Sequence, residues 1–595
     1  MTSSGADLDV DVVVVGTGPT GAAAALALST YGIDVLVVTQ HGRLSDTPRA
    51  HITNQRTMEV LRDLGVAEDI GRYATPWDSM GDTLFTTSLA GPEVARIRAW
   101  GTGEERIADY LRTSPCTPLD VAQPDMESVL VRHATTRGAS LRFATRYLSH
   151  QQDDAGVSVQ LEDRLTGRVY TVRCQYLVGA DGARSKIADD LGLDVEGTMA
   201  RAATIYVLFE ADLRRYAEHR RSVLYWILSD TTSHGEIRMG LLRAVRPWTR
   251  WIAGWGYDMA AEEPDLSDKT VTERIRSLIG DARQEIRIEQ KTTWFVNEAY
   301  ARTYSRGRVF CGGDAVHRHP PSNGLGSNTG IQDAYNLAWK LAFVLKGWAG
   351  AGLLESYSHE RALIGRQVVD RANQSRLDFA PLHACLRGTG RKSSVADAVA
   401  RLRDPGPEGV AMRADLERAV ELKNYEFNAL GVETNQRYES SAVLADTDGT
   451  KEAWPRDPQL HPQPTTRPGA KIPHAWLVDA RGKKVSTLDI TGRGKMTLVI
   501  GLSGSVWVDA VEKLAMPCLT AVVIGGSDAK DLYFSWHRAR EIGESGAILV
   551  RPDGYVAWRC AASADNVDDA RRLLGQAIGS LLDLGGHGTG SARSS

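Results

Sequence analysis

The sequence predicts an α/β protein with three parts: a unit built on a parallel sheet, an inserted antiparallel sheet, and a small C-terminal α/β domain. A strand, glycine turn and helix occupy residues 10–39, and aromatic-rich alternating runs fill much of residues 192–297. Strand and helix signals alternate again after residue 467. At 595 residues, the chain exceeds what one hydrophobic core usually supports, so several domains are expected.

Residues 10–39 have the pattern of one βαβ unit. The apolar run 12–15 is typical of a buried parallel strand, residues 22–28 predict a helix, and residues 33–38 predict the next strand. The turn between them is GTGPTG, a GxGxxG motif whose glycines let the backbone approach a pyrophosphate. We therefore expect a Rossmann-like fold whose dinucleotide contacts include Gly16, Gly18, Pro19, Thr20 and Gly21.

The acidic residue that usually holds the adenosine ribose is missing from this unit. Thr39 and Gln40 stand where that acid is expected, about eighteen residues after the third glycine. A hydroxyl or an amide can still bond a ribose, so we expect Thr39 and Gln40 to make a weaker contact.

A second glycine turn occupies residues 307–341. A short apolar strand, 309–311, leads into Gly312, Gly313 and Asp314, and helical spacing resumes near residue 331. An acid at a strand end can accept ribose or ribityl hydroxyls, and bare N–H groups at a helix N-terminus suit an electron-rich ligand edge. The alternative is a buried turn that needs glycine only for its backbone angles. The first motif favours the nucleotide interpretation, and Asp181-Gly182 after strand 177–180 adds a third turn of this kind.

Polar residues lie between these turns. The stretch 48–65 predicts a helix in its second half and brings Arg49 and His51 close together in its first half. Arg49 follows the first motif closely enough to reach a phosphate, although a solvated helix face is the alternative. Gln123 precedes a further amphipathic helix.

The middle of the chain predicts an antiparallel sheet. Its strand-like runs are residues 222–228, 235–245, 246–258 and 292–300. Such a sheet can form a wall for an aromatic ligand or only a core. Residues 400–465 are polar and proline-rich and predict a partly helical linker, after which strands near 496–502, 519–526 and 546–560 predict the last domain.

Composition excludes several classes of function. The formal net charge is −4 with no long basic run, so no nucleic-acid surface is expected. The six cysteines are isolated, with no metal-ligand spacing, so neither a metal site nor a disulfide frame is expected. The N-terminal apolar run is too short for a signal or a membrane span, so we expect a cytoplasmic protein without a membrane partner.

Three motifs in order, GTGPTG at 16–21, ADG at 180–182 and GDAVHRHPPSNGLGSN at 313–328, resemble the FAD-dependent aromatic hydroxylases, the single-component flavoprotein monooxygenases. PRAHITNQRTMEVLRDLG and SVLYWIL are similar to the phenol 2-monooxygenase and 2,4-dichlorophenol 6-monooxygenase branch. The resemblance implies an FAD-binding domain from residues 1–78, 102–191 and 298–380, and a substrate-binding domain from 79–101 and 192–297. A helical linker (381–465), a thioredoxin-like domain (466–582) and a flexible tail (583–595) complete the expected organisation.

The resemblance also implies roles for residues. Gly16, Gly18 and Gly21 would serve the ADP half of FAD, and Asp181 both FAD and NAD(P)H. Arg49 and Gln123 would contact the flavin, Asp314 the ribityl chain, and the flavin ring would lie against Pro321, Gly324, Gly326, Ser327 and Asn328. The arginine that often closes the ADG motif is absent: Ala188 stands near its place, with Arg184 and Lys186 as candidate replacements.

Catalytic and substrate roles follow from the same resemblance. His51 falls where related phenol hydroxylases carry an aspartate thought to promote ionisation of the substrate hydroxyl. We therefore expect His51 and Pro321 at the catalytic centre, and His51, Tyr225 and Trp226 against the substrate.

The implied reaction is hydroxylation of a phenol-like or hydroxypyridine-like ring. FAD is reduced by NADPH or NADH, O₂ adds to give a flavin C4a-hydroperoxide, and its distal oxygen passes to the ring. A neutral His with a pKa of about 6.5 is a weak base for a phenol near 10, so a relay or a more acidic substrate is needed. The alternatives are an oxidase or dehydrogenase without oxygen insertion, a hydroxylase that tailors an aromatic natural product, or a non-catalytic scaffold. We also expect a homo-oligomer.

Overall fold

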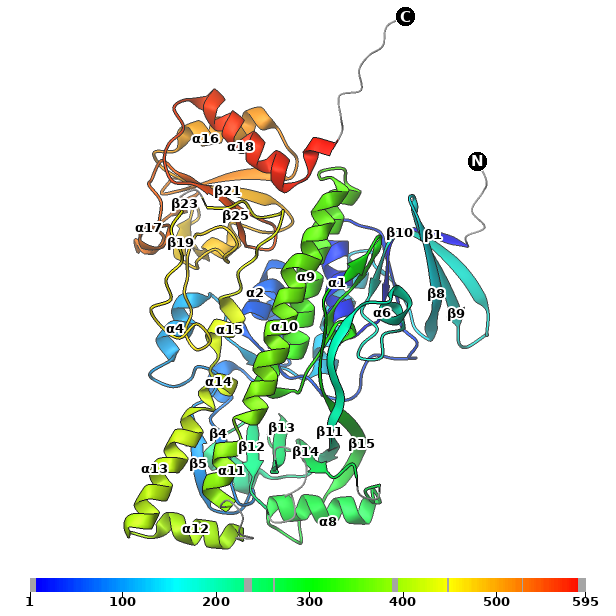
Figure 1. Ribbon diagram of the computed structural model, residues 1–595, viewed down its shortest axis with the longest axis vertical. Coiled ribbons are helices and arrows are strands. Elements are labelled where there is room, and N and C mark those ends of the chain that lie inside the picture. The colour runs from blue at the N-terminus through cyan, green and yellow to red at the C-terminus, as the bar shows by residue number, and fades with distance from the viewer. Residues whose placement is uncertain are drawn as a thin grey trace, which may run out of the picture.

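The computed structural model describes residues 7–229, 238–260, 263–387, 394–446, 449–526 and 528–586. Two long helices, α9 (Leu325–Leu345) and α10 (Glu355–Leu377), run between three sheets (Figure 1). Across the described ranges, none of the helices combines the length and apolar character that a membrane crossing requires. The predicted tail begins with the short turn Leu584–Gly586, and residues 587–595 lie outside the described residues.

The first sheet is the parallel sheet of the nucleotide-binding unit. Its order is β16 (Ser305–Arg306), β17 (Val309–Cys311), β10 (Val169–Gly179), β1 (Leu8–Val15), β2 (Val35–Val38) and β7 (Ser140–Arg142). All neighbours from β17 to β7 are parallel, and the hairpin of β8 (Thr145–Asp153) and β9 (Gly156–Asp163) adds to β10. Val15 pairs with Gly179 and Gly179 with Cys311, so the three predicted turns begin at one edge.

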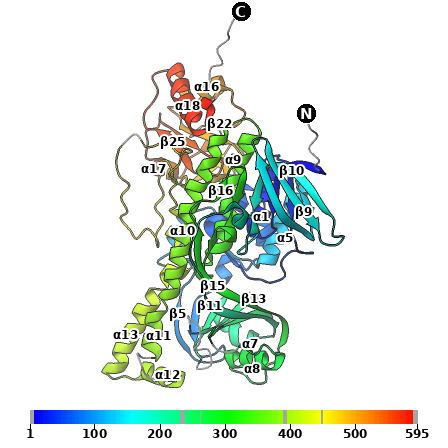
Figure 2. The ribbon, with the colours of Figure 1, turned by 45° about the vertical axis from the view of Figure 1, so that its right-hand side comes forward.

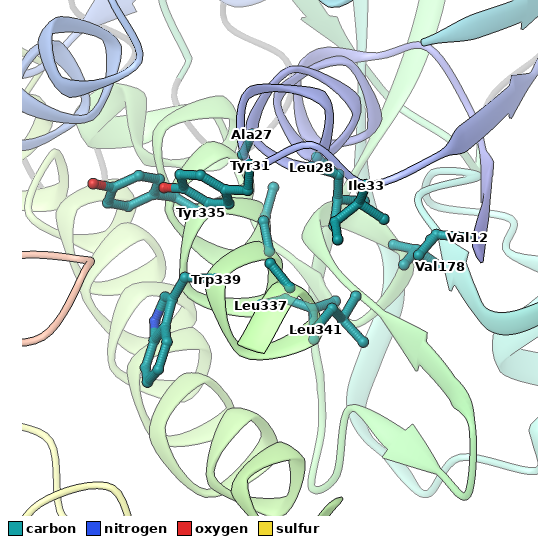
Figure 3. Close-up of a cluster of buried hydrophobic side chains, with 14 of the residues drawn as sticks. Val12, Ala27, Leu28, Tyr31, Ile33, Val178, Tyr335, Leu337, Trp339 and Leu341 are labelled. Atoms are coloured by element: carbon teal, nitrogen blue, oxygen red, sulfur yellow. The ribbon is translucent and has the colours of Figure 1, made fainter. Parts of the chain in front are cut away.

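Helix α1 (Pro19–Thr30) packs between this sheet and α9. Residues 22–25 of α1 are all alanine and all buried, which lets the helix lie close to its neighbours. Figure 3 shows Leu28 and Tyr31 from the end of α1 beside Tyr335, Leu337 and Leu341 of α9. Further helices cover the sheet and its loops: α2 (Gln55–Asp63), α3 (Ala67–Gly71), α4 (Ile107–Thr113), α5 (Gln123–Thr136) and α6 (Lys186–Leu191).

The second sheet is the predicted inserted sheet. Its order is β18 (His317–Arg318), β15 (Arg287–Ala301), β11 (Val195–Glu210), β14 (Arg250–Tyr257), β13 (Gly240–Arg246), β12 (Leu224–Ile227), β4 (Thr83–Thr86) and β5 (Glu93–Ile97). All neighbours are antiparallel except β12 and β4. The first residues of the predicted run 235–245 lie outside the described residues.

Both faces of the second sheet are covered. One face packs on α7 (Arg214–Ala217) and α8 (Asp268–Ile279), in a cluster that includes Tyr225 and Trp251. On the other side lie α11 (Ala380–Arg387), α12 (Val395–Arg403) and α13 (Pro407–Glu421), and Figure 2 shows the two groups of helices flanking the sheet. Leu382, Leu416 and Phe427, all from the predicted linker, join a core cluster with Trp226, so much of that linker is packed structure.

The C-terminal domain has a seven-stranded mixed sheet. Its order is β20 (Lys484–Ser486), β19 (Trp476–Asp479), β23 (Ala529–Lys530), β22 (Leu519–Ile524), β21 (Met496–Gly501), β24 (Ala547–Val550) and β25 (Val556–Cys560). Its helices are α16 (Ser505–Leu514), α17 (Ser535–Ala539) and α18 (Val567–Leu581), and the short α14 (Asn424–Phe427) and α15 (Leu430–Thr434) precede the domain.

Buried charges join this domain to α9 and α10. Arg551 donates to both carboxylate oxygens of Glu360, at 2.5 and 2.9 Å, and to Asp553 at 2.6 Å. Lys340 also donates to Glu360, at 2.8 Å, and all four side chains are at most 1% exposed. Burial opposes ionisation of Glu360, but Arg551 and Lys340 hold its pKa well below its usual value. Each of these four buried side chains therefore depends on the others to remain charged.

We expect Glu360→Gln to destabilise the protein. The change leaves Arg551 and Lys340 buried without their shared carboxylate, and breaking a buried pair typically costs about 3–5 kcal/mol. Urea unfolding at neutral pH measures the loss. The control is Asp415→Asn, which removes an exposed ion pair with Arg418. Equal stability of Glu360→Gln and the wild type would contradict this account.

Candidate functional site

The first glycine turn has the shape of a ligand cradle. Gly16 has φ +113°, and a Cβ there would lie 2.1 Å from the carbonyl oxygen of Ala180; a Cβ on Gly21 would lie 2.1 Å from that of Gly16. A Cβ on Gly18 would meet no atom within 4 Å, and Gly18 begins α1 without a side-chain cap. The backbone N–H groups at the start of α1 therefore face open space, as a phosphate requires.

Two predicted acids follow neighbouring strands but differ in surroundings. Asp181 accepts from Ser185 Oγ at 2.6 Å and from the backbone N–H of Ile187 at 3.2 Å, and its burial raises its pKa. Asp314 is exposed, although residues 309–313 and 315–317 around it are buried. Its carboxylate is therefore available to a ligand, whereas Asp181 holds its own turn.

The turn before α9 has an unusual backbone. Asn323 and Gly324 both have φ +64°, and α9 begins at Leu325 without a side-chain cap. A Cβ on Gly324 would lie 3.2 Å from Ile52, and exposed Pro321 precedes this turn. Gly326 and Ser327, in the first turn of α9, are partly exposed.

Asn328, predicted to lie against the flavin, is buried and bonds to the backbone. Its amide donates to the carbonyls of Ile52 at 2.8 Å and Gly324 at 2.6 Å, and accepts from the N–H of Asn54 at 3.0 Å. The side chain thus ties the His51 loop to the start of α9.

Three further predicted cofactor residues, Arg49, Gln123 and Thr20, differ in what their side chains contact. Arg49 is exposed near Glu127, and Glu127 accepts from Gln123 at 2.6 Å. The Thr20 hydroxyl lies so close to Gly313 and Gly330 that a Cβ on either glycine would clash with it, which indicates a packing role.

At the end of β2, the Thr39 hydroxyl is buried and accepts a long bond of 3.4 Å from the N–H of His41. Gln40 is exposed, and its carbonyl accepts from Arg164 at 2.7 Å. Gln40 is therefore better placed than Thr39 to offer its side chain to a ribose.

His51 belongs to a cluster that the sequence did not reveal. Its Nδ1 lies 3.1 Å from Asp120 Oδ1, and Arg243 Nη2 lies 3.5 Å from the same oxygen. Arg243 Nη1 also donates to the carbonyl of Pro48 at 2.6 Å. The short ladder of β3 (Ile52–Thr53) and β6 (Leu119–Asp120) pairs Ile52 with Asp120 and so fixes the acid beside His51. The one sequence signal that pointed to Asp120 was its position three residues before Gln123.

Electrostatics keep this cluster in a defined state. Burial and the charge of Arg243 lower the pKa of His51, and Asp120 opposes them only in part. Burial also opposes ionisation of Asp120, but His51 and Arg243 lower its pKa. Near neutral pH His51 is therefore an uncharged imidazole whose Nδ1–H donates to Asp120, which leaves Nε2 as an acceptor.

The second sheet presents one face to this cluster. The register places Trp226, Leu241 and Tyr206 on one face with Arg243, because directly paired residues share a face. Tyr225 points to the opposite face, where it packs on Trp251. Tyr225, which was predicted to lie against the substrate, therefore faces away from the His51 cluster.

Tyr206 is an unpredicted aromatic residue on the cluster's face. Its ring meets Trp294 edge to face at 5.5 Å, and burial raises its pKa to about 12, so its hydroxyl stays protonated. Among the described residues, Trp226 Nε1, Trp294 Nε1 and Arg243 Nε are buried without a hydrogen-bond partner. A face with aromatic rings and unpartnered donors suits an aromatic ligand that carries an oxygen.

Two further histidines flank the second glycine turn. His317 Nε2 lies 2.8 Å from Asp333, and both side chains are fully buried. His319 Nδ1 donates to the carbonyl of Pro320 at 2.7 Å, and burial and the neighbouring His317 lower its pKa to about 4. Across the described ranges, no group of three or more His, Cys, Asp or Glu side chains has a metal-binding arrangement.

Comparisons with known proteins show which family the chain resembles. Residues 9–372 match the family described as FAD binding domain, and residues 465–580 match the aromatic-ring hydroxylase C-terminal family. The 2,4-dichlorophenol 6-monooxygenase of Cupriavidus pinatubonensis is 47% identical, with 92% of this chain and 94% of that protein covered. The phenol 2-monooxygenase of a Pseudomonas species is 45% identical, with 91% and 88% covered.

A solved structure is also similar over the whole chain. The flavin-dependent monooxygenase PieE in complex with FAD and substrate has a TM-score of 0.92 at 41% identity, with 97% of this chain and 100% of that chain covered. The two matched family models, the two relatives and this solved structure all indicate the same family. The chain belongs to the family of FAD-dependent aromatic-ring hydroxylases.

Proposed function

We propose that this enzyme hydroxylates a phenol-type ring held between the His51 cluster and the aromatic face of the second sheet. One observation carries the proposal: an uncharged His51, oriented by Asp120, lies on the side of the sheet that presents Trp226 and Tyr206. Product analysis under ¹⁸O₂ with a panel of phenols and hydroxypyridines tests it. Label in the ring hydroxyl supports hydroxylation, and an oxidised product without label supports the oxidase alternative.

Several residues would hold FAD. The start of α1 at Gly18 would take the pyrophosphate, Asp314 the ribityl hydroxyls, and the uncapped start of α9 near Gly326 the flavin edge. Arg49 and Gln123 would lie toward the flavin side. Bound FAD supplies the chemistry of electron uptake from NADPH or NADH and of O₂ activation. The chain's part is to orient the ring, exclude water and manage the phenolic proton.

His51 is the group we assign to that proton. Its Nε2 would accept the hydroxyl proton of the substrate while its Nδ1–H stays bonded to Asp120, which stabilises the resulting imidazolium. The phenolate that forms is more electron-rich and therefore more reactive toward an electrophilic oxygen. Because the pKa of His51 is lowered, the proposal favours acidic phenols, such as those with halogen substituents.

The C-terminal domain is assigned a thioredoxin-like fold within this proposal. Parallel strands β21, β22 and β23 followed by the antiparallel pair β24 and β25, with α16 and α18 beside them, support that assignment. Cys518 and Cys560 are both free, so dithiol exchange is not expected of this domain. O₂ as co-substrate, homo-oligomer formation and a cytoplasmic location stay predictions of the sequence.

We expect Asp314→Ala to weaken FAD binding strongly, because a ribityl hydroxyl would lose a charged acceptor. Hydrogen bonds to charged groups are worth about 1.5–3 kcal/mol, which corresponds to a rise of about 10- to 150-fold in the FAD dissociation constant. Fluorescence titration of FAD into the stripped protein measures it. Asp509→Ala, at an exposed position of α16, is the control. Wild-type affinity in Asp314→Ala would refute the assignment of this turn.

We expect His51→Ala to keep FAD but to slow ring hydroxylation by about 10²-fold, the lower range for a lost general base. NAD(P)H oxidation should continue with release of hydrogen peroxide, measured as the ratio of product to peroxide. Raising the pH or supplying a more acidic phenol should restore coupling, because the phenolate then forms unaided. The control is His219→Ala, at an exposed histidine. Full coupling of His51→Ala with unsubstituted phenol at neutral pH would leave His51 a structural residue.

We expect Asp120→Asn to change both the rate and its pH dependence. Asp120 raises the pKa of His51, so its neutralisation should move the acidic limb of the product-formation rate to lower pH. The plateau should fall by about 10- to 100-fold, because Nδ1–H loses its charged acceptor and the imidazole its fixed tautomer. Asp125→Asn, on α5, serves as the control. An acidic limb that stays at the wild-type pH would show that Asp120 does not act through His51.

A further inference from the structure

The tip of the C-terminal hairpin lies inside the FAD-binding part of the chain. The hairpin tip consists of residues 551–555, between β24 and β25, and Arg551, Asp553 and Tyr555 are each at most 2% exposed. Tyr335 of α9 donates to the carbonyl of Pro552 at 3.0 Å, and Arg56 of α2 donates to that of Asp553 at 2.7 Å. Figure 1 shows the C-terminal domain alongside α2 and α9. Arg551 of the tip also bonds to Glu360 of α10. The tip therefore lies among α2, α9 and α10, and its contacts are charged and aromatic side chains.

Tyr555 connects the hairpin tip to a buried arginine. Its hydroxyl donates to Gln436 Oε1 at 3.2 Å, and the same oxygen accepts from Arg361 Nη1 at 2.9 Å. The Tyr555 ring stacks on Tyr438 at 4.0 Å, and the Tyr438 hydroxyl accepts from Arg361 at 2.9 Å. Two side chains that Tyr555 touches therefore fix one edge of the Arg361 guanidinium.

Arg361 leads directly to the second glycine turn. Its Nε donates to Asp333 Oδ1 at 2.7 Å, and Asp333 Oδ2 accepts from the backbone N–H of Gly313 at 3.0 Å and from His317 Nε2 at 2.8 Å. Gly313 and His317 bracket Asp314. Burial opposes ionisation of Asp333, but Arg361 and His317 lower its pKa, so the carboxylate is charged and needs all three donors.

We propose that the hairpin tip of the C-terminal domain is a positioning element for the Gly313–Asp314 turn, acting through Gln436, Tyr438, Arg361 and Asp333. This inference rests on the proposed role of Asp314 in FAD binding. Every side chain in the chain of contacts is buried, so no water competes for the bonds and each member's geometry depends on its neighbours. The domain therefore contributes to cofactor affinity without touching the cofactor.

Each test variant replaces one residue in this chain of contacts and leaves Asp314 unchanged. Gln436→Leu removes the acceptor shared by Tyr555 and Arg361, and Tyr555→Leu removes the hydroxyl and the stacked ring. Each should raise the FAD dissociation constant of the full-length protein about 10-fold, within the range of couplings carried by packed networks. Gln436→Glu keeps an acceptor for both partners but loses the bond that Gln436 Nε2 donates to Gln332 at 2.9 Å, so it should lose clearly less FAD affinity than Gln436→Leu.

The matched control crosses the same domain interface away from the turn. Arg62 of α2 donates twice to Asp489 of the C-terminal domain, at 2.7 and 2.9 Å, and Asp489→Asn weakens that pair. We expect this variant to lower the melting temperature and to leave FAD affinity unchanged. The bound flavin's visible absorption spectrum, recorded for all variants, should shift only in Gln436→Leu and Tyr555→Leu.

Several outcomes would overturn the proposal. Folded Tyr555→Leu and Gln436→Leu with wild-type FAD affinity would refute it, and so would an equal loss in Asp489→Asn, which would indicate general loosening. If Tyr555→Leu fails to fold, the contrast of Gln436→Leu with Gln436→Glu decides. Asp314→Ala separates the two hypotheses: if it binds FAD normally, the proposed function of the turn fails, and if it alone loses FAD, only the hairpin inference fails.

Discussion

The parallel pairing of β10 with β1 on one side and β17 on the other is the constraint on which the site depends. Because Val15, Gly179 and Cys311 lie in register, the turns that follow them meet at one edge although they are far apart in sequence. The close contact of Gly16 with Ala180 exists only in that register.

The elements of this edge were predictable because their signals are local. A strand, a glycine turn and a helix follow one another within about thirty residues, a spacing that the βαβ geometry itself sets. Asp120, Tyr206 and Asp333 were missed because each acquires its role from a partner distant in sequence. Tyr225 was misplaced for a different reason: both faces of the second sheet are buried, so alternation along its strands does not show which face lies toward the His51 cluster.

The C-terminal domain shows the same limit of sequence reasoning for charges. Arg551, Asp553 and Glu360 have the composition of a solvated surface, and only the fold places them together without water. Charged residues are rarely fully buried unless paired, so such a cluster marks a fixed interface between domains. The buried ion pairs of the C-terminal domain make it part of the core against which α9 and α10 pack.

Charged side chains have different effects at the second glycine turn and at the substrate face. Around the second glycine turn, His317, Asp333 and Arg361 form a closed set of charged bonds that resists change. Around the substrate face, burial and the charge of Arg243 suppress protonation of His51, while Asp120 favours it. A base poised by opposing charges can take a proton and return it, which a hydroxylase needs in every turnover.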